Sequence, residues 1–320
     1  MSRDGNGTHE SGSVLSKYNE SAFSKVMLLL YSAMSVWIIV VNTMTLVVYG
    51  KSRTLMNRRN VLIVSLSTVD LFTGLTTFMP KLISNAVSGS DPFTICMISS
   101  AVQIAPPWSS IFHLVAIAIE RHIAITKPLM YQVLVTPRRL AFAVCANIGS
   151  GCFFALVPLA WPRDQFQKVC LSILWYPRWY RYTFLVVPMA VALSLISLIY
   201  LHIYTIARTH ERAISAAEQN NPNRNDLQSR KESRATRVFI LICGIALACY
   251  VPFWTAIVLL ISKPNSQTII YIYYLSSLCL YSNSGMNFVV YAVRNEEFRT
   301  KMNKLFKRNN SVLNDSSATD

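Results

Sequence analysis

Seven separate apolar stretches, each about long enough to cross a lipid bilayer, divide this chain of 320 residues. A helix of about 20 apolar residues spans the hydrocarbon core of a membrane. Because 52% of the residues are hydrophobic and only 14% are charged, the chain has too little polar material to cover a soluble globule. We therefore expect an all-α membrane protein, a seven-transmembrane helix bundle. The predicted spans lie near residues 26–49, 60–83, 96–125, 140–161, 182–207, 238–261 and 268–293.

The basic residues predict which way this bundle faces. Cytosolic loops of membrane proteins carry an excess of Lys and Arg, and the basic residues here follow the first, third, fifth and seventh spans. We therefore expect a multi-pass protein of the plasma membrane with an extracellular N-terminus, where Asn6 and Asn19 begin glycosylation motifs. The formal net charge of +15 lies in short stretches rather than along one soluble face, which argues against nucleic acid as a partner.

Three smaller parts are expected outside the bundle of residues 26–293. Residues 1–25 show no cleavable leader pattern and should form a retained extracellular tail. Phe298, Met302 and Leu305 recur at helical spacing, with lysines on the other faces. This pattern predicts a short cytosolic amphipathic helix over residues 294–308, lying on the membrane surface. Residues 309–320 are polar and should form a disordered cytosolic tail.

Several polar residues inside the apolar spans should share one depth. Polar groups are costly in hydrocarbon and are therefore functional candidates. Counted from the basic cytosolic boundaries, Asn42, Asp70, Ser110 and Asn287 lie roughly 10 to 17 Å into the membrane at the helical rise of 1.5 Å per residue. The sequence thus predicts a polar layer in the inner half of the bundle.

The seventh span can aim Asn283, Ser284 and Asn287 toward Asp70, because Asn283 and Asn287 stand four residues apart on one helical face. A carboxylate surrounded by hydroxyl and amide oxygens, with Ser110 among them, could hold a small hard cation such as sodium. The alternative is a hydrogen-bonded network that only joins the helices. Both interpretations stay open, and no other cofactor is expected.

A charged triplet ends the third span at the cytosolic boundary. Glu120, Arg121 and His122 occupy this place, and Glu232 begins the sixth span at the same boundary. An ion pair from Arg121 to Glu232 would hold the two helices together, and its rupture would open a cytosolic cleft. The alternative interpretation is that these are interfacial charges whose long side chains reach the water.

Short motifs also occur in a fixed order in five of the spans. They comprise Asn42, the run from Ser65 to Leu71, Glu120-Arg121-His122 followed by Pro128-Leu129, the run from Cys249 to Phe253, and Asn283-Ser284 followed by the run from Asn287 to Tyr291. Their order and spacing resemble the rhodopsin-like (class A) family of G-protein-coupled receptors over nearly the whole chain. Residues 116–131 look locally most like adenosine and amine receptors.

This resemblance implies a receptor that passes extracellular ligand binding to a cytosolic heterotrimeric G protein, with arrestin as a further candidate partner. It also implies a disulfide between Cys96 and Cys170 in the oxidising compartment. The family's switch and coupling positions fall on Glu120, Arg121, His122, Pro128, Leu129, Glu232, Tyr250, Pro252, Asn287 and Tyr291.

Three residues in or beside these motifs depart from the family pattern. The family commonly has Tyr where His122 stands, Trp where Tyr250 stands and Pro where Phe288 stands. Phe288 restores a backbone N–H, so the seventh helix should be straighter there, and the smaller Tyr250 should lower the barrier to movement of the sixth helix. We therefore expect altered basal activity.

The resemblance also places a ligand cavity between the outer halves of the third, fifth, sixth and seventh spans. Its matching residues are Gln103, Pro107, Phe253, Trp254, Ser277 and Tyr281. The ligand is expected to be an unknown small molecule or peptide. An ordinary biogenic amine is disfavoured because amine receptors have Asp where Gln103 stands, although cation–π contact with Trp254 and Tyr281 could partly substitute.

Other functions fit the sequence less well. A retinal protein needs a lysine in the seventh span, which has none, and adenosine receptors have a purine-binding Asn where Ile257 stands. A transporter should show several buried charges or paired broken helices. An enzyme is not expected, because no catalytic constellation appears on an accessible face. A non-signalling or constitutively active receptor remains the closer alternative.

Overall fold

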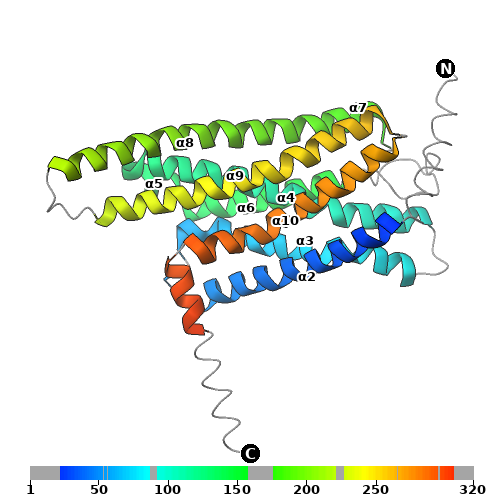
Figure 1. Cartoon of the computed structure of the whole chain (residues 1–320), viewed down its shortest axis with the longest axis horizontal. Coiled ribbons are helices and arrows are strands. Elements are labelled where there is room, and N and C mark those ends of the chain that lie inside the picture. The colour runs from blue at the N-terminus through cyan, green and yellow to red at the C-terminus, as the bar shows by residue number, and fades with distance from the viewer. Residues whose placement is uncertain are drawn as a thin grey trace, which may run out of the picture.

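Seven long helices run side by side along the molecule in the computed structural model (Figure 1), which describes residues 22–86, 92–157, 176–220, 227–294 and 296–305, apart from positions 53, 56 and 265. Short helical segments connect or flank some of them. The long helices are α2 (Ala22–Gly50), α3 (Val61–Ala86), α4 (Pro92–Thr126), α6 (Pro137–Leu156), α8 (Val187–Asn220), α9 (Leu227–Ser262) and α10 (Gln267–Arg294). The short segments are η1 (Arg58–Asn60), η2 (Pro128–Met130), α5 (Tyr131–Leu134), α7 (Arg178–Tyr180), the π-helix η6 (Arg181–Val186) and helical residues 296–305.

The seven-helix bundle predicted from the apolar stretches is confirmed. Each long helix contains the predicted span or most of it, and the fourth span is described as helix only to Leu156. By length and composition, five of the described helices could cross a membrane, namely Ala22–Gly50, Thr94–Thr126, Pro137–Leu156, Arg181–Thr209 and Ile240–Ser262. Helix α3 has a shorter apolar part, Val61–Thr77. Helix α10 buries five polar side chains, Ser276, Ser277, Asn283, Ser284 and Asn287.

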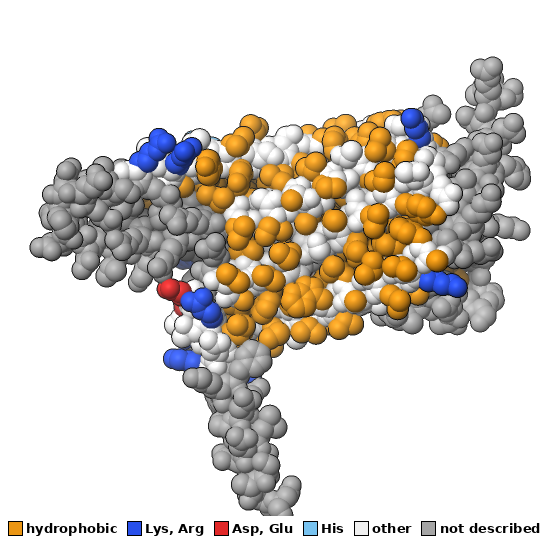
Figure 2. Space-filling model, in the orientation of Figure 1, with side chains coloured by type: hydrophobic (Ala, Val, Ile, Leu, Met, Phe, Trp, Pro, Cys, Tyr) orange, Lys and Arg blue, Asp and Glu red, His pale blue; other side chains and the backbone are white. Residues whose placement is uncertain are grey.

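The outer surface of the bundle is apolar, as lipid requires. Large hydrophobic side chains such as Leu29 (70% exposed), Phe142 (76%) and Leu198 (66%) point away from the core. Figure 2 shows hydrophobic side chains spread over the middle of the visible face, with Lys and Arg at its two ends. Helices suit this environment because every backbone polar group within them finds its partner inside the same segment.

Helix packing brings α4 to the centre of the bundle. It contacts α3, α6, α8 and α9, while α10 packs between α9 and α2. The core includes Leu66, Ile111, Leu114 and Ile196, each at most 1% exposed. Helix α4 continues through Pro106 and Pro107, and α9 continues through Pro252.

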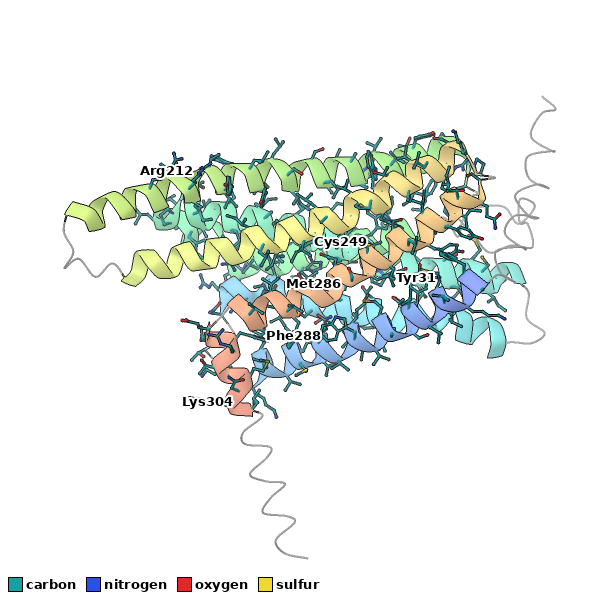
Figure 3. The ribbon with its side chains drawn as sticks, viewed as in Figure 1. Tyr31, Arg212, Cys249, Met286, Phe288 and Lys304 are labelled. Carbon is teal, nitrogen blue, oxygen red and sulfur yellow. The ribbon has the colours of Figure 1, made fainter. Side chains whose placement is uncertain are left out.

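The last described helix, residues 296–305, turns across the end of the bundle (Figure 1). Phe298 is completely buried, with its ring centroid 5.7 Å from that of Tyr49, 6.0 Å from that of Phe288 and 6.1 Å from that of Tyr291. Helix α10 is unbroken through Phe288 (Figure 3), and the ring of Phe288 is part of this aromatic cluster. The apolar face of the predicted surface helix thus anchors it to α2 and α10.

Close packing of α4 against α6 yields a test of the fold. Replacing Gly151 with Ala should lower stability, because the added methyl group would overlap Ser109 Oγ and the Ala105 carbonyl oxygen. Overpacking of this kind costs about 1–3 kcal/mol. The measurement is the midpoint of thermal unfolding of the purified protein in one detergent.

Gly149 provides the matched control in the same helix, because a methyl group there would meet nothing within 4 Å. Gly149→Ala should be neutral or stabilising by up to about 1 kcal/mol, the helix preference of Ala over Gly. Equal midpoints for the two variants would contradict the close approach of α4 and α6.

Candidate functional site

A buried carboxylate joins three helices in the inner half of the bundle. Asp70 of α3 is fully buried, and its Oδ1 accepts hydrogen bonds from Ser110 Oγ of α4 at 3.2 Å and Ser284 Oγ of α10 at 2.8 Å. Its Oδ2 accepts one from Asn287 Nδ2 at 3.0 Å. Both oxygens of Asp70 therefore have donors, as a buried polar group requires. Of the residues for which the sequence predicts one depth, Asp70, Ser110 and Asn287 meet here, and Ser284 of α10 joins them.

Two further residues expected near Asp70 form no hydrogen bond to it. Asn42 Nδ2 donates to the carbonyl oxygens of Ser284 at 2.9 Å and Ile38 at 3.0 Å, so Asn42 joins α2 to α10 without touching Asp70. Asn283 is 1% exposed, and neither polar atom of its amide has a hydrogen-bond partner. A buried amide left in this way retains an oxygen that could bind a cation or a water molecule.

At the inner end of α4, Arg121 pairs with its own neighbour. Arg121 Nε lies 2.9 Å from Glu120 Oε2, and the other oxygen of Glu120 accepts a hydrogen bond from the Tyr131 hydroxyl. Tyr131 begins α5, so this bond ties the short helix after α4 to the charged triplet. Glu232 lies in α9, but its side chain is outside the described residues, and the predicted Arg121–Glu232 pair stays a prediction.

The segment that follows α4 exposes an apolar side chain at this end of the molecule. Pro128 and Leu129 lie in η2, and Leu129 is 95% exposed. His122, the third member of the triplet, has its Nε2 at 2.8 Å from Nδ1 of His202 in α8. One imidazole must donate and the other accept across this distance, so two histidines join α8 to α4 near the C-terminal end of α4.

Of the predicted moving parts of α9 and α10, Tyr250 and Tyr291 are buried, whereas Pro252 is exposed. The Tyr250 hydroxyl, on a side chain 2% exposed, donates to the Pro107 carbonyl oxygen of α4 at 3.3 Å. Pro252 lies two residues further along α9, and Tyr291 of α10 is 3% exposed in the aromatic cluster around Phe298. The contact from Tyr250 to Pro107 is one that the sequence did not indicate.

The residues expected to line the ligand cavity each contact a different neighbour. Gln103 Nε2 donates to the Ser99 carbonyl oxygen of its own helix at 3.1 Å, and Trp254 Nε1 donates to the Val186 carbonyl oxygen of η6 at 3.2 Å. Phe253 faces the ring of Tyr273 at a centroid distance of 5.7 Å.

A tyrosine of the first long helix joins two further residues of this set. The Tyr31 hydroxyl lies 2.6 Å from Ser277 Oγ and also donates to the Tyr274 carbonyl oxygen at 2.8 Å. The rings of Tyr31 and Tyr281 meet edge to face at 6.0 Å. In Figure 3, Tyr31 lies between α2 and the outer part of α10. Helix α2 therefore closes one side of the outer half.

Three residues that the sequence interpretation missed thus take part in the candidate site, Tyr31, Tyr131 and His202, and a fourth, Arg181, is buried at the start of η6. Each is polar or charged within or beside an apolar stretch, which is the only signal the sequence offers. Arg181 is the clearest case, because it is only 8% exposed at the outer end of the fifth span.

Other predicted groups lie partly or wholly beyond the described residues. Cys96 is bonded in a disulfide at the outer end of α4, but Cys170 is outside the described residues, so their pairing stays a prediction. The glycosylation sites Asn6 and Asn19 also fall outside them. Among the described side chains, no group of three or more His, Cys, Asp or Glu could hold a metal ion.

Comparisons with known proteins agree with this arrangement. The family model described as 7 transmembrane receptor (rhodopsin family) matches residues 41–291. The chain is 25% identical to trace amine-associated receptor 13c of Danio rerio, with 93% of this chain and 91% of that receptor covered. It is 26% identical to the histamine H2 receptor of Cavia porcellus, with 83% and 75% covered. For the adenosine receptor A2b of Bos taurus the identity is 27%, with 83% and 85% covered.

The matched region includes every long helix apart from the start of α2 and the last residues of α10. The polar layer around Asp70 and the charged triplet at Arg121 both fall inside it. The family and these relatives are receptors rather than enzymes, and they signal through G proteins from the plasma membrane. This chain belongs to the rhodopsin family of seven-transmembrane receptors and is a G-protein-coupled receptor.

Proposed function

We propose that ligand binding between the outer halves of the helices activates a heterotrimeric G protein through α4, α9 and α10. The observation that carries this proposal is the series of contacts along α4. Its Pro107 carbonyl accepts from Tyr250, its Ser110 donates to Asp70, and its inner end carries Arg121. One continuous helix thus joins the expected ligand region, the polar layer and the proposed cytosolic surface.

Movement of α9 would first change the contact that Tyr250 makes with α4. The Tyr250 hydroxyl forms a hydrogen bond from α9 to the Pro107 carbonyl oxygen of α4, and Pro107 lies one turn from Ser110. A shift or rotation of α4 changes the hydrogen bonds to Asp70, which α10 shares through Ser284 and Asn287. Interlocked buried hydrogen bonds rearrange between discrete states rather than gradually. This coupling supports a two-state element.

The cytosolic surface has the groups that a protein partner would contact. Arg121 is held by Glu120, which Tyr131 also binds, and Leu129 offers an exposed apolar side chain beside them. We propose that opening this end exposes Arg121 to the G protein while Pro128 and Leu129 dock against it. Arrestin would use the same surface. An extracellular N-terminus, with glycans at Asn6 and Asn19, follows from this orientation.

The relatives named for trace amines, histamine and adenosine suggest a small-molecule ligand for this chain too. The outer residues that support such a site are Phe253, Trp254 and Tyr281, all aromatic, with Ser277 beside them. Gln103 stands where amine receptors hold an Asp, and its amide donates to its own helix. We therefore expect the ligand to be recognised mainly by aromatic contacts together with a polar group other than an aspartate.

Sodium fits the polar layer as an inhibitory ion. Asp70 would hold it, with Ser110, Ser284, Asn283 and Asn287 as neighbours, because hard cations prefer carboxylate, hydroxyl and amide oxygens. The supporting observation is Asn283, whose buried amide oxygen lacks a protein donor one residue from Ser284. A cation beside Asp70 would favour the arrangement in which these side chains converge.

Arg121→Ala should abolish G-protein activation, because the guanidinium is the charged group presented to the partner. The measurement is receptor-dependent nucleotide exchange in membranes with matched surface expression. The expected result is a fall to the level of membranes without receptor. Arg212→Ala is the control: it removes an exposed positive charge of α8 that points away from the bundle (Figure 3). Retained exchange in Arg121→Ala would remove this residue from the switch.

Sodium chloride should lower ligand-free nucleotide exchange relative to choline chloride at equal ionic strength. Asp70→Asn should remove the difference, because the neutral amide binds a cation poorly. Ser35→Ala is the control, since this buried hydroxyl donates to the Gly74 carbonyl oxygen at 2.6 Å and takes no part in the Asp70 contacts. Equal effects of the two salts on the unmodified receptor would contradict the sodium site and leave the Asp70 residues as a hydrogen-bonded network that only joins the helices.

Tyr250→Phe should raise ligand-free nucleotide exchange, because it deletes the hydrogen bond to Pro107 while keeping the ring. A buried neutral hydrogen bond contributes about 1 kcal/mol, so the balance between the states should shift roughly five-fold. Tyr204→Phe, at an exposed position of α8, should change nothing. Unchanged exchange in Tyr250→Phe would show that this contact does not restrain α9.

A further inference from the structure

A cavity opens between two short helical segments beside the inner end of α4. Its volume is about 410 Å³, and its lining residues are Asn57, Arg58, Tyr131 and Gln132. Arg58 begins η1, and Tyr131 begins α5. Cavities that bind small molecules have volumes of roughly 300–1,000 Å³, so this one is large enough for a ligand with a single ring.

The wall that α5 contributes is held at both of its ends. Tyr131 is 8% exposed, and its hydroxyl donates to Glu120 of the charged triplet. At the other end of α5, Arg139 Nη1 donates to the carbonyl oxygens of Leu134 at 2.9 Å and Val133 at 3.4 Å. The ring of Tyr131 therefore forms a fixed and largely buried part of the lining.

The facing wall is anchored through the connection between α2 and α3. Leu55 is 1% exposed, and its carbonyl oxygen accepts a hydrogen bond from Asn60 Nδ2 at 2.8 Å. Asn57 Nδ2 donates to the Thr54 carbonyl oxygen at 3.3 Å, which leaves the amide oxygen of Asn57 available to a ligand. Arg58 thus lines the cavity from a turn that is fixed to the core.

The lining offers one positive charge and two amides. Asn57, Arg58 and Gln132 are all exposed. Among the described residues, no carboxylate forms an ion pair with the Arg58 guanidinium. A guanidinium binds phosphate oxygens through two parallel N–H bonds, and amides exchange hydrogen bonds with hydroxyl groups. This combination suits a phosphate group carried on a ring with several hydroxyls.

Apolar side chains adjoin the lining residues along the chain. Val133 follows Gln132 and is 62% exposed, and Val61 begins α3 three residues after Arg58 and is 36% exposed. A soluble phosphate compound gains nothing from such neighbours, whereas a phospholipid joins its headgroup to acyl chains. Anionic lipids are concentrated in the cytosolic leaflet, and basic pockets on that side of a membrane bind phosphorylated headgroups.

We propose that this cavity binds the phosphorylated inositol headgroup of a phospholipid in the cytosolic leaflet. The phosphate binds Arg58, and the ring hydroxyls contact the amides of Asn57 and Gln132. The acyl chains lie along Val61 and Val133. The proposal rests on the proposed orientation of the bundle, with η1 and α5 on the cytosolic side, and it requires neither the extracellular ligand nor the G protein.

Occupation of the cavity has a consequence for the charged triplet. A headgroup packed on the Tyr131 ring restrains α5, and the Tyr131 hydroxyl binds Glu120, the partner of Arg121. A molecule that binds one arrangement of a protein in preference to others stabilises that arrangement. The bound lipid therefore favours the state in which Arg121 is paired with Glu120.

The test measures the thermal unfolding midpoint of the full-length protein in nanodiscs of stated lipid composition. Phosphatidylcholine alone is the baseline. It is compared with phosphatidylcholine that contains phosphatidylinositol monophosphate or, at equal total charge, phosphatidylserine. The inositol lipid should raise the midpoint more than phosphatidylserine does. Equal midpoints with these two lipids would indicate general attraction to a basic surface and would overturn the proposal.

Soluble inositol monophosphate, added to phosphatidylcholine nanodiscs, distinguishes a phospholipid from a free phosphate compound. At the concentration used for the lipid, it should leave the midpoint unchanged. A shift as large as that produced by the lipid would overturn the assignment to a phospholipid. Absence of a shift with every one of these compounds would also overturn the proposal and would favour a protein partner for the cavity.

Arg58→Gln should weaken the apparent affinity for the inositol lipid by roughly 10- to 100-fold, as expected for loss of a charge-assisted hydrogen-bonded pair. Arg58→Lys should keep part of the affinity, because an ammonium group cannot bind two oxygens in parallel. Arg138→Gln is the matched control, since it removes an exposed charge at the start of α6 that does not line the cavity.

Unchanged affinity in Arg58→Gln, or an equal loss in Arg138→Gln, would overturn the proposal. Each variant is compared with its own midpoint in phosphatidylcholine alone, so a change in intrinsic stability does not enter the comparison. Nucleotide exchange separates this proposal from G-protein coupling. Lipid binding that requires Arg58, in a protein that produces no exchange, would uphold the lipid site and contradict coupling. Exchange that requires Arg121, in a protein indifferent to the inositol lipid, would do the reverse.

Discussion

A single ionisable side chain at hydrocarbon depth dictates much of the arrangement of this bundle. The carboxylate of Asp70 has no access to water, so its stability depends on donors from neighbouring helices. Those donors come from α4 and α10, and this requirement fixes the rotation of both helices about their own axes. Asn42, by binding the Ser284 carbonyl, extends the constraint to α2. Apolar packing alone would tolerate many rotations, because lipid and core side chains are chemically alike.

The helices and the depth of the polar groups could be predicted from the sequence, because both depend on distances along one chain. Hydrophobic length gives the spans, and the rise per residue gives the level of Asp70 and Ser110. Asn283, expected beside Asp70, makes no hydrogen bond to the carboxylate, whereas Ser284 and Asn287 of the same helix do. Adjacent helical residues point about 100° apart, so Asn283 and Ser284 direct their side chains differently. Counting depth does not show which of the two bonds to Asp70.

Contacts between side chains on different helices were harder to foresee. The pairing of His122 with His202 and of Tyr31 with Ser277 requires knowledge of which helices are neighbours and how each is rotated. Tyr250 shows the same limit more sharply. The sequence marks it only as a smaller residue at a family position, yet its hydroxyl forms a bond to α4 that a Trp would not make in the same way. A substitution interpreted as loosening α9 thus also introduces a restraint.

The burial of Phe298 has a consequence for the membrane around the receptor. Its ring is enclosed by Tyr49, Phe288 and Tyr291, so residues 296–305 move with the inner ends of α2 and α10. In the proposed orientation, this helix with Lys301 and Lys304 would lie among the headgroups of the cytosolic leaflet. On that proposal, a state that displaces α10 also shifts this helix against the charge and lateral pressure of the phospholipids. The resting balance of the receptor would then depend in part on the composition of the bilayer around it.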